Sequence, residues 1–248
     1  MRVKQITTIT LLSSILLFFS SCENDEGFGG NSHIQGRIIK KIYNNDFSVL
    51  QEEMPAKDED VFISFGDQPY VAEKTETSYL GNFTFEYLFS GDYKVFYYSK
   101  EFSVINSEKK EVIHEVSLSK GKTINLGELI IYDTYDFDEG NATIQGKVFV
   151  KNYFNSSSWP NLIVKDITPA QELEIYLTYG NHKQYDKRIR TNHDGTFAFT
   201  NLIKGNYLIY LYSEDVKGGT ADIVIQKEIQ ITEKDQLVQL EDITIEKL

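Results

Sequence analysis

Cysteine is almost absent from this 248-residue sequence, which has one cysteine, Cys22, and four histidines. A single cysteine excludes an internal disulfide and a zinc site built on cysteine pairs. The histidines form no H-x-x-x-H pair; we expect His182 and His193 in turns, and His114 half-buried and hydrogen-bonded in a strand. The sequence also lacks a G-x-S-x-G motif, a P-loop and a nucleophile with a neighbouring base. These absences favour a protein that is not an enzyme.

Basic residues are few as well: 25 Lys and Arg stand against 37 Asp and Glu, a formal net charge of -12. Without residues 1–21, which include Arg2 and Lys4, the chain has 23 basic residues and a net charge of -14. A chain this acidic is repelled by nucleic acid and by an anionic bilayer surface. We therefore expect no nucleic-acid partner, and contact with a membrane only through an attached lipid.

The first 21 residues have the features of a secretory signal peptide, since Arg2 and Lys4 precede a short apolar stretch that ends in small residues. The stretch Phe19-Ser20-Ser21-Cys22 resembles the lipobox of bacterial lipoproteins, in which the signal is removed before a cysteine that carries a diacylglycerol. The alternative is an ordinary signal with an incidental cysteine. The resemblance predicts Cys22 as the lipid anchor and the outer membrane as the location.

Residues 22–31 follow as a predicted flexible tether, because three of their last five residues are glycines. The tether begins with an acidic group formed by Glu23, Asp25 and Glu26. This group is similar to the export signal of surface lipoproteins in Bacteroidetes-type bacteria. It implies exposure on the cell surface.

The chain contains an internal repeat. "GNFTFEYLFSGDYKVFYYS" at 81–99 returns at 195–213 as "GTFAFTNLIKGNYLIYLYS", and "IQGRIIKKIY" at 34–43 returns at 144–153 as "IQGKVFVKNY". Order and spacing are kept along each copy, which predicts two tandem domains of one fold. The predicted limits are 32–133 for the first domain, 134–140 for an acidic linker and 141–248 for the second domain.

Both copies have the pattern of an all-β sandwich: apolar residues alternate or form short blocks, and turn residues interrupt them about every 8–12 residues. Gly81 and Gly195 are expected in turns with positive φ. The alternating residues that follow Gly195, from Phe197 to Leu211, are expected to face the core. In the second copy the pattern predicts strands near 142–150, 172–179, 184–191, 196–199, 206–213, 221–231 and 237–246.

The repeated motif resembles a known family. "IQG" at the start of a strand, followed about fifty residues later by G-x-F-x-F-x-x-L-x-x-G-x-Y, is similar to the carboxypeptidase regulatory-like domains. The resemblance covers nearly all of 32–133 and 141–248. It implies two tandem prealbumin-like sandwiches of about seven strands each, which serve as binding, accessory or spacer modules without catalytic activity.

The predicted linker lies in a stretch with four carboxylates, Asp133, Asp136, Asp138 and Glu139. Carboxylates at a junction between β-domains can bind Ca²⁺, since a hard cation needs several oxygen ligands. The spacing is not that of an EF-hand, and a solvated acidic linker is the alternative. A structural calcium ion at the linker is the one cofactor that the sequence suggests.

Three aromatic residues are candidate ligand-binding residues. Trp159, the sole tryptophan, follows a serine run in a loop and could stack on the face of a sugar; the alternative is that it plugs the open end of its own sandwich. Tyr210 and Tyr212, like Phe96 and Tyr98 in the first copy, point away from the inward row of their strand. They are expected to form a surface for a partner, or to be covered by long side chains of neighbouring strands.

Together these features predict an outer-membrane or cell-surface lipoprotein that acts as a binding or accessory module, for a glycan or for an outer-membrane partner protein. The alternative is a structural stalk or a subunit of a surface adhesin, in which the repeat provides length. A binding module predicts an aromatic-bearing surface in one copy, whereas a stalk predicts two featureless domains in line. An enzyme of unrecognised type is a third alternative, and no motif supports it.

Overall fold

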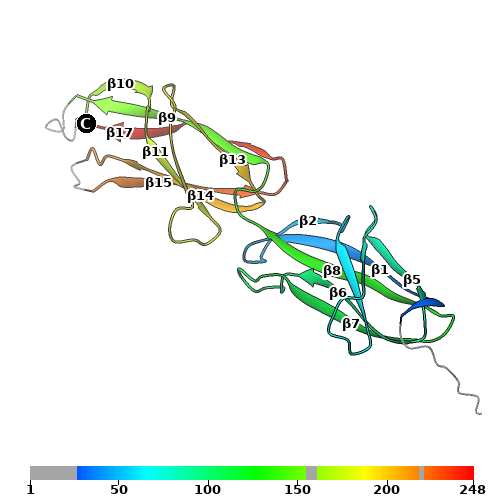
Figure 1. Cartoon of the computed structure of the whole chain (residues 1–248). Coiled ribbons are helices and arrows are strands. Elements are labelled where there is room, and N and C mark those ends of the chain that lie inside the picture. The colour runs from blue at the N-terminus through cyan, green and yellow to red at the C-terminus, as the bar shows by residue number, and fades with distance from the viewer. Residues whose placement is uncertain (1–26, 155–160, 218–220) are drawn as a thin grey trace, which may run out of the picture.

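The computed structural model describes residues 27–154, 161–217 and 221–248. These residues form strands and connecting loops, so the chain is all-β, as predicted. The same ranges contain no helix that is long and apolar enough to cross a bilayer. Figure 1 shows two groups of strands placed end to end, with the C-terminus at the far end of the second group.

Strands β1–β8 form the first group, which we call the first copy. β1 pairs antiparallel with β2 and β5 and parallel with β8, and a second sheet has the order β4-β3-β6-β7. Both sheets contribute to one cluster of buried side chains, so the first copy is a β-sandwich. The strand bounds are Phe28–Asn44 (β1), Leu50–Pro55 (β2), Asp60–Phe65 (β3), Glu73–Glu76 (β4), Asn82–Leu88 (β5), Gly91–Ser99 (β6), Lys110–Leu118 (β7) and Thr123–Tyr135 (β8).

Strands β9–β17 form the second copy and repeat this arrangement. β9 pairs antiparallel with β10 and β13 and parallel with β16 and β17, and the facing sheet has the order β12-β11-β14-β15. A separate cluster of buried side chains fills this sandwich. The bounds are Ala142–Tyr153 (β9), Val164–Pro169 (β10), Glu174–Tyr179 (β11), Lys187–Arg190 (β12), Thr196–Leu202 (β13), Gly205–Ser213 (β14), Ile223–Ile231 (β15), Leu237–Gln239 (β16) and Ile243–Lys247 (β17).

The strand count differs from the expected seven per copy. Among the described residues the first copy has eight strands and the second has nine, because β16 and β17 together take the place of β8. β10 was not predicted. None of its side chains is buried, so it lacks the alternation of apolar residues by which a half-buried strand is recognised.

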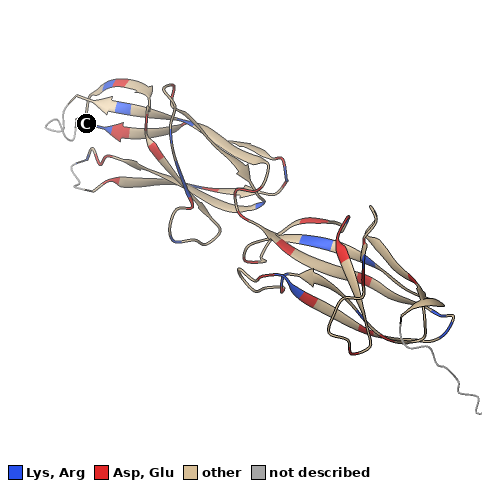
Figure 2. Ribbon diagram, viewed as in Figure 1, with Lys and Arg blue, Asp and Glu red and all other residues tan. Residues whose placement is uncertain are grey.

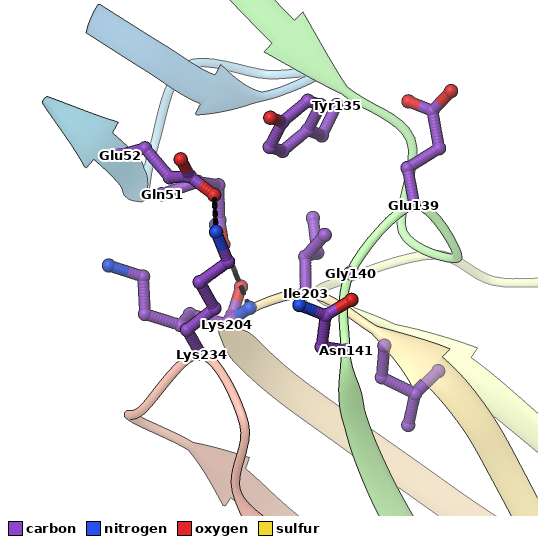
Figure 3. Close-up of a pocket in the computed structure, with 10 residues that line it drawn as sticks. Gln51, Glu52, Tyr135, Glu139, Gly140, Asn141, Ile203, Lys204 and Lys234 are labelled. Atoms are coloured by element: carbon purple, nitrogen blue, oxygen red, sulfur yellow. Dashed lines mark hydrogen bonds and ion pairs between the residues drawn. The ribbon is translucent and has the colours of Figure 1, made fainter. Parts of the chain in front are cut away.

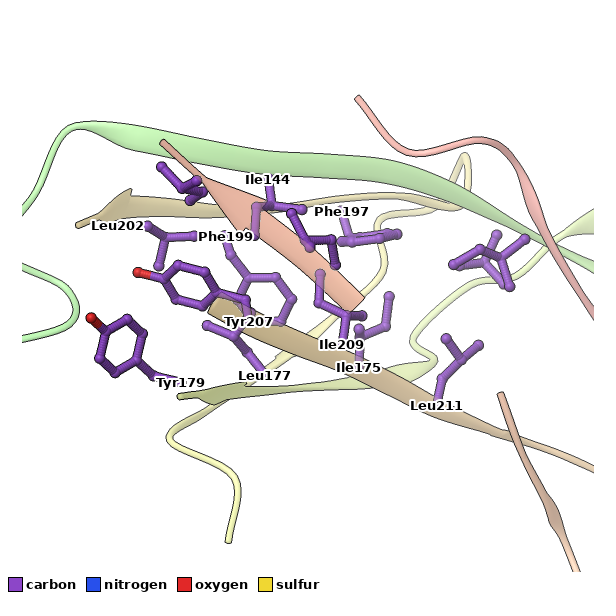
Figure 4. Packing of buried hydrophobic residues seen from close by; sticks show 14 of the residues in the cluster. Ile144, Ile175, Leu177, Tyr179, Phe197, Phe199, Leu202, Tyr207, Ile209 and Leu211 are labelled. Carbon is purple, nitrogen blue, oxygen red and sulfur yellow. The ribbon is translucent and has the colours of Figure 1, made fainter. Parts of the chain in front are cut away.

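The repeated motif builds the core, as predicted. Phe197 and Phe199 are 3% and 0% exposed, and the inward row of β14 is equally buried (Figure 4). Gly195 has φ +81°, and a Cβ there would lie 2.4 Å from the carbonyl oxygen of Val148. Gly81 has φ +80° and the same close approach to a β1 carbonyl in the first copy. A side chain at either position is therefore both strained and obstructed.

The segment that precedes each copy is part of its sandwich, which differs from the predicted limits. The N–H of Phe89 donates to the carbonyl of Gly27 at 2.9 Å, and the N–H of Ile203 donates to the carbonyl of Phe137 at 3.1 Å. β1 therefore begins at Phe28, inside the predicted tether, and the end of the predicted linker is fixed to the second copy in the same way.

Candidate functional site

Four tyrosines gather on the outer face of the β12-β11-β14-β15 sheet. Tyr176 on β11 and Tyr210 on β14 are cross-strand neighbours, and their rings stack at 5.0 Å with an interplanar angle of 10°. Tyr212 stands edge-on to both rings, at 5.9 and 6.1 Å. Tyr185, from the loop that leads to β12, lies 5.3 Å from Tyr176 on an inclined plane. We call these four residues the tyrosine face.

The first copy has the same three-ring geometry at the equivalent positions. Phe62 and Phe96 stack at 5.2 Å and 17°, and Tyr98 stands edge-on to both at 5.7 and 6.3 Å. The arrangement of three rings is therefore a property of the repeated sheet. The chemistry differs, because two phenylalanines in the first copy are tyrosines in the second, where a fourth ring is added.

The candidates Tyr210 and Tyr212 take different places in this cluster. Tyr212 is 43% exposed and Tyr185 is 49% exposed, so both present ring surface to solvent. Tyr210 is only partly exposed, with one ring face covered by Tyr176. Tyr210 thus supports the exposed rings rather than serving as a platform.

Charged side chains flank the tyrosine face on β11 and β12. The Tyr176 hydroxyl donates to Glu174 Oε2 at 2.6 Å, while Arg190 and Arg188 approach Glu174 Oε1 at 3.2 and 3.4 Å. The hydrogen bonds from Tyr176 and Arg190 hold the pKa of the Glu174 carboxyl below its usual value. Glu174 is therefore a carboxylate that fixes one hydroxyl and two guanidinium groups beside the exposed rings. None of these three charged residues was singled out from the sequence.

The four carboxylates near the linker have separate partners in the structure, and calcium binding by them stays a prediction. No group of three or more His, Cys, Asp or Glu side chains within the described ranges is arranged to hold a metal ion. Asp136 accepts a hydrogen bond from Asn45, Asp138 lies 3.8 Å from Lys187, and Glu139 accepts the N–H of Asp136 at 2.7 Å. Each carboxylate is satisfied by a different partner.

Asp133 belongs to a half-buried cluster of charges in the first copy. Its carboxylate lies 3.3 Å from Lys109, 3.4 Å from Lys100 and 3.8 Å from Lys40. Burial alone would raise the pKa of Asp133, but the backbone N–H of Thr134 and the ammonium groups of Lys109 and Lys100 outweigh it and lower the pKa. Three lysine ammonium groups therefore offset the charge of this carboxylate within the first copy.

The junction between the copies contains direct side-chain contacts (Figure 3). The amide of Gln51 on β2 accepts the backbone N–H of Lys204 at 2.8 Å and donates to the carbonyl of the same residue at 2.9 Å. Glu52 pairs with Lys234 at 2.5 Å. These contacts border a small cavity of about 180 Å³, which Tyr135 also lines. A cavity of this size is small for an organic ligand, so we interpret the junction as structural.

A larger cleft of about 450 Å³ lies beside the junction. Asn44, Asp46 and Ser48 from the first copy and Asn181 and His182 from the second copy line it. The polar groups from the first copy are committed to their own turn, since Asn44 binds Ser48 and Val49 while Asp46 accepts from Ser48. The cleft is therefore bordered by turn structure rather than by convergent free groups.

The histidines occupy the places that the sequence predicts, with one difference. His193 lies in the turn before β13, and His182 follows the turn after β11, 2.8 Å from Asp186. His114 on β7 is half-buried and stacks on Tyr97 at 5.8 Å, and burial lowers its pKa. Its Nε2 has no hydrogen-bond partner among the described residues, contrary to expectation.

Two candidate residues lie outside the described residues. Cys22, the predicted lipid anchor, precedes residue 27, and Trp159 falls in 155–160. Both stay predictions.

The fold and surface define an all-β protein with two tandem sandwiches and a tyrosine-rich face on the second. No family model matches the chain, so the likeness to carboxypeptidase regulatory-like domains stays a resemblance. No curated protein matches it either.

Several solved structures are similar to the chain at a low level. The Bacillus anthracis TIE protein is 16% identical, with a TM-score of 0.29; the match covers 86% of this chain and 35% of that one. The minor pilin GBS52 of Streptococcus agalactiae is 14% identical (TM-score 0.30, 86% and 96% covered), and the shaft pilin spaA of Lactobacillus rhamnosus GG is 8% identical (TM-score 0.24, 86% and 97% covered). These scores are too low to carry an argument about function.

Proposed function

We propose that the protein is a non-catalytic outer-membrane lipoprotein, anchored through Cys22, that binds a glycan on the tyrosine face of its second copy. The first copy then acts as a spacer between the membrane and the binding face. The observation that carries the proposal is the difference between two otherwise equivalent ring clusters. A cluster built on a phenylalanine pair in the first copy has four hydroxyl-bearing rings in the second.

The chemistry of the tyrosine face suits a sugar. A pyranose has an apolar C–H face and a rim of hydroxyls, so it needs an aromatic surface next to hydrogen-bonding groups. Tyr212 and Tyr185 present exposed rings, while Glu174 and Arg188 provide acceptors and donors beside them. Tyrosine also loses little side-chain entropy on binding, because it has only two χ angles.

The position of the anchor supports the role of the first copy. Gly27, whose carbonyl is hydrogen-bonded to the first sandwich, is only five positions after Cys22. Five residue-to-residue steps of extended chain span at most about 17 Å. The first copy is thus held close to the bilayer, and the second copy lies beyond it (Figure 1).

The alternative is a stalk, in which the contact that joins the two copies is repeated from one domain to the next. This alternative has less support. The contacts that join the copies involve Gln51 and Glu52 on β2. The equivalent positions of β10 hold Lys165 and Asp166. The amide that fixes the junction is therefore absent from the free end of the second copy. Acidic and basic residues are interspersed along both copies rather than gathered at their ends (Figure 2).

The test is a glycan array probed with the full chain in detergent, next to Tyr212→Ala and the matched variant Tyr98→Ala. We expect Tyr212→Ala to lower the affinity for the captured glycans by about tenfold, because one exposed aromatic contact is lost. Its melting temperature should stay nearly unchanged because Tyr212 is 43% exposed. Tyr98→Ala should bind as the parent does. Equal losses in both variants, or capture of no glycan at all, would contradict the proposal.

A further inference from the structure

We infer that the glycan bound on the tyrosine face is acidic, and that Arg188 and Arg190 on β12 recognise its carboxylate or sulfate group. This inference rests on the proposed function and names the ligand class. It starts from the distribution of arginine. The chain has 21 lysines and only four arginines, and two of the four lie on the four-residue strand β12.

The equivalent strand of the first copy provides an internal comparison. β4 pairs with β3 in the same register in which β12 pairs with β11, so Glu73–Glu76 corresponds to Lys187–Arg190. The first segment reads Glu-Lys-Thr-Glu, with a net charge of -1, and the second reads Lys-Arg-Ile-Arg, with a net charge of +3. The change of four charges comes from Lys187 and Arg190, which stand where the first copy has Glu73 and Glu76. Lys74, beside Phe62, corresponds to Arg188, beside Tyr176. The second copy therefore has three cations on this strand beside its tyrosines, whereas the first copy has one cation between two carboxylates.

The register of the sheet puts these cations in line with the rings. Arg188 is the cross-strand neighbour of Tyr176, which in turn neighbours Tyr210. Arg190 is the neighbour of Glu174. An anionic group at Arg188 and a sugar ring against Tyr185 or Tyr212 are therefore within the span of one short oligosaccharide, because Tyr176 contacts both rings at 5.3 and 5.9 Å.

The acids around β12 leave the guanidinium groups available. Glu174 is 32% exposed and is shared by both arginines, which are 50% and 60% exposed and extend further into solvent. Glu172 approaches Arg190 at 3.6 Å but is itself 74% exposed, so this pair is weak. Each guanidinium has five N–H donors in a planar fork. Glu174 thus holds both arginines in place on the sheet. The remaining guanidinium N–H groups can donate to a second carboxylate or to a sulfate.

The experiment compares an oligogalacturonate of defined length with its methyl ester, a chondroitin sulfate oligosaccharide and polyglutamate, by calorimetry on the full chain. We expect the oligogalacturonate or the sulfated sugar to bind at least tenfold more tightly than the uncharged ester, and the preference between the two to identify the anionic group. Arg188→Gln should remove this advantage, while Lys74→Gln, the matched change on β4, should keep it. Arg188→Lys should restore only part of it, because an ammonium cannot bind two oxygens side by side.

Equal affinity for the acid and its ester, or an acid advantage that survives Arg188→Gln, would overturn the inference and leave the glycan proposal standing. Polyglutamate binding as tight as that of the acidic sugar would show recognition of charge without the sugar and would also overturn it. If none of the sugars bound and Tyr212→Ala changed nothing on the array, the proposed function itself would fall. A thermal melt of each variant establishes that it is folded.

Discussion

The substitution Gln51→Ala tests how the two copies are joined. The Gln51 side chain is only 7% exposed and forms both of its junction hydrogen bonds with the backbone of Lys204, at 2.8 and 2.9 Å. Each such bond contributes about 0.5–1.5 kcal/mol net. Removing the amide also leaves the Lys204 N–H and C=O without this partner. We therefore expect the junction to lose about 2–3 kcal/mol.

The neighbouring ion pair between Glu52 and Lys234 contributes less to the stability of the junction than the Gln51 amide does. Lys234 is 55% exposed and Glu52 is 18% exposed, and an ion pair with one solvated partner contributes about 0–1 kcal/mol. Lys234→Ala should therefore affect the junction less than Gln51→Ala does. High salt should weaken the pair of Glu52 and Lys234 while leaving the amide contact in place.

Hydrogen exchange at the Lys204 amide measures this difference directly. A loss of about 2 kcal/mol corresponds to exchange that is about 30-fold faster, provided that the junction opens locally. Lys165→Ala, at the equivalent position of β10, is the matched control and should leave that amide unchanged. Unaltered protection of the Lys204 amide in Gln51→Ala would refute the reasoning, because the amide would then owe its protection to something other than this side chain.

Three further predictions concern other parts of the chain. The pKa of Asp133 is lowered on folding, so its stabilisation is fully present above the unfolded pKa near 3.8 and is lost as the pH falls through the lower folded pKa. Asp133→Asn should therefore cost about 1 kcal/mol at pH 7 and progressively less as the pH falls below 3.8, as measured by urea unfolding. Gly195→Ala should destabilise the second copy by about 1–3 kcal/mol because of its positive φ and the nearby Val148 carbonyl, and an unchanged melting temperature would count against that geometry. Cys22→Ser should move the protein out of the membrane fraction or leave the signal peptide uncut. Unchanged partitioning of the variant into the detergent phase would contradict lipid attachment at Cys22.

The inward rows could be predicted from the sequence because alternation alone assigns them. Residues such as Phe197, Phe199 and Tyr207 follow a turn glycine at fixed spacing, and a period of two places them on one face. The edge strand β10 could not be predicted in this way, since none of its side chains is buried. The first and last strands of the second copy lie close to their predicted positions near 142–150 and 237–246. The start of the first copy differs, because β1 begins at Phe28 and the carbonyl of Gly27 accepts a backbone hydrogen bond from Phe89.

The tyrosine face was predicted only in part. Tyr210 and Tyr212 were found because they alternate with core residues on one strand. Tyr176 and Arg188 lie on other strands, and only the pairing register brings them to the same face. The repeat itself contains a signal for these residues, because the shift of 114 residues aligns Tyr176 with Phe62 and the basic strand at 187–190 with Glu73–Glu76. The linker carboxylates are close in the sequence, yet in the structure each has a different partner, which the sequence alone does not show.

The central claim, that the second copy carries the ligand on its tyrosine face, is tested most directly by ring-labelled tyrosine NMR. The chain has 16 tyrosines, and Tyr→Phe variants assign the signals. Titration of the full chain in detergent with oligogalacturonate should shift the ring signals of Tyr185 and Tyr212 and leave that of Tyr98 in place. Shifts confined to tyrosines of the first copy, or unchanged signals of Tyr185 and Tyr212 at saturating ligand, would contradict the account.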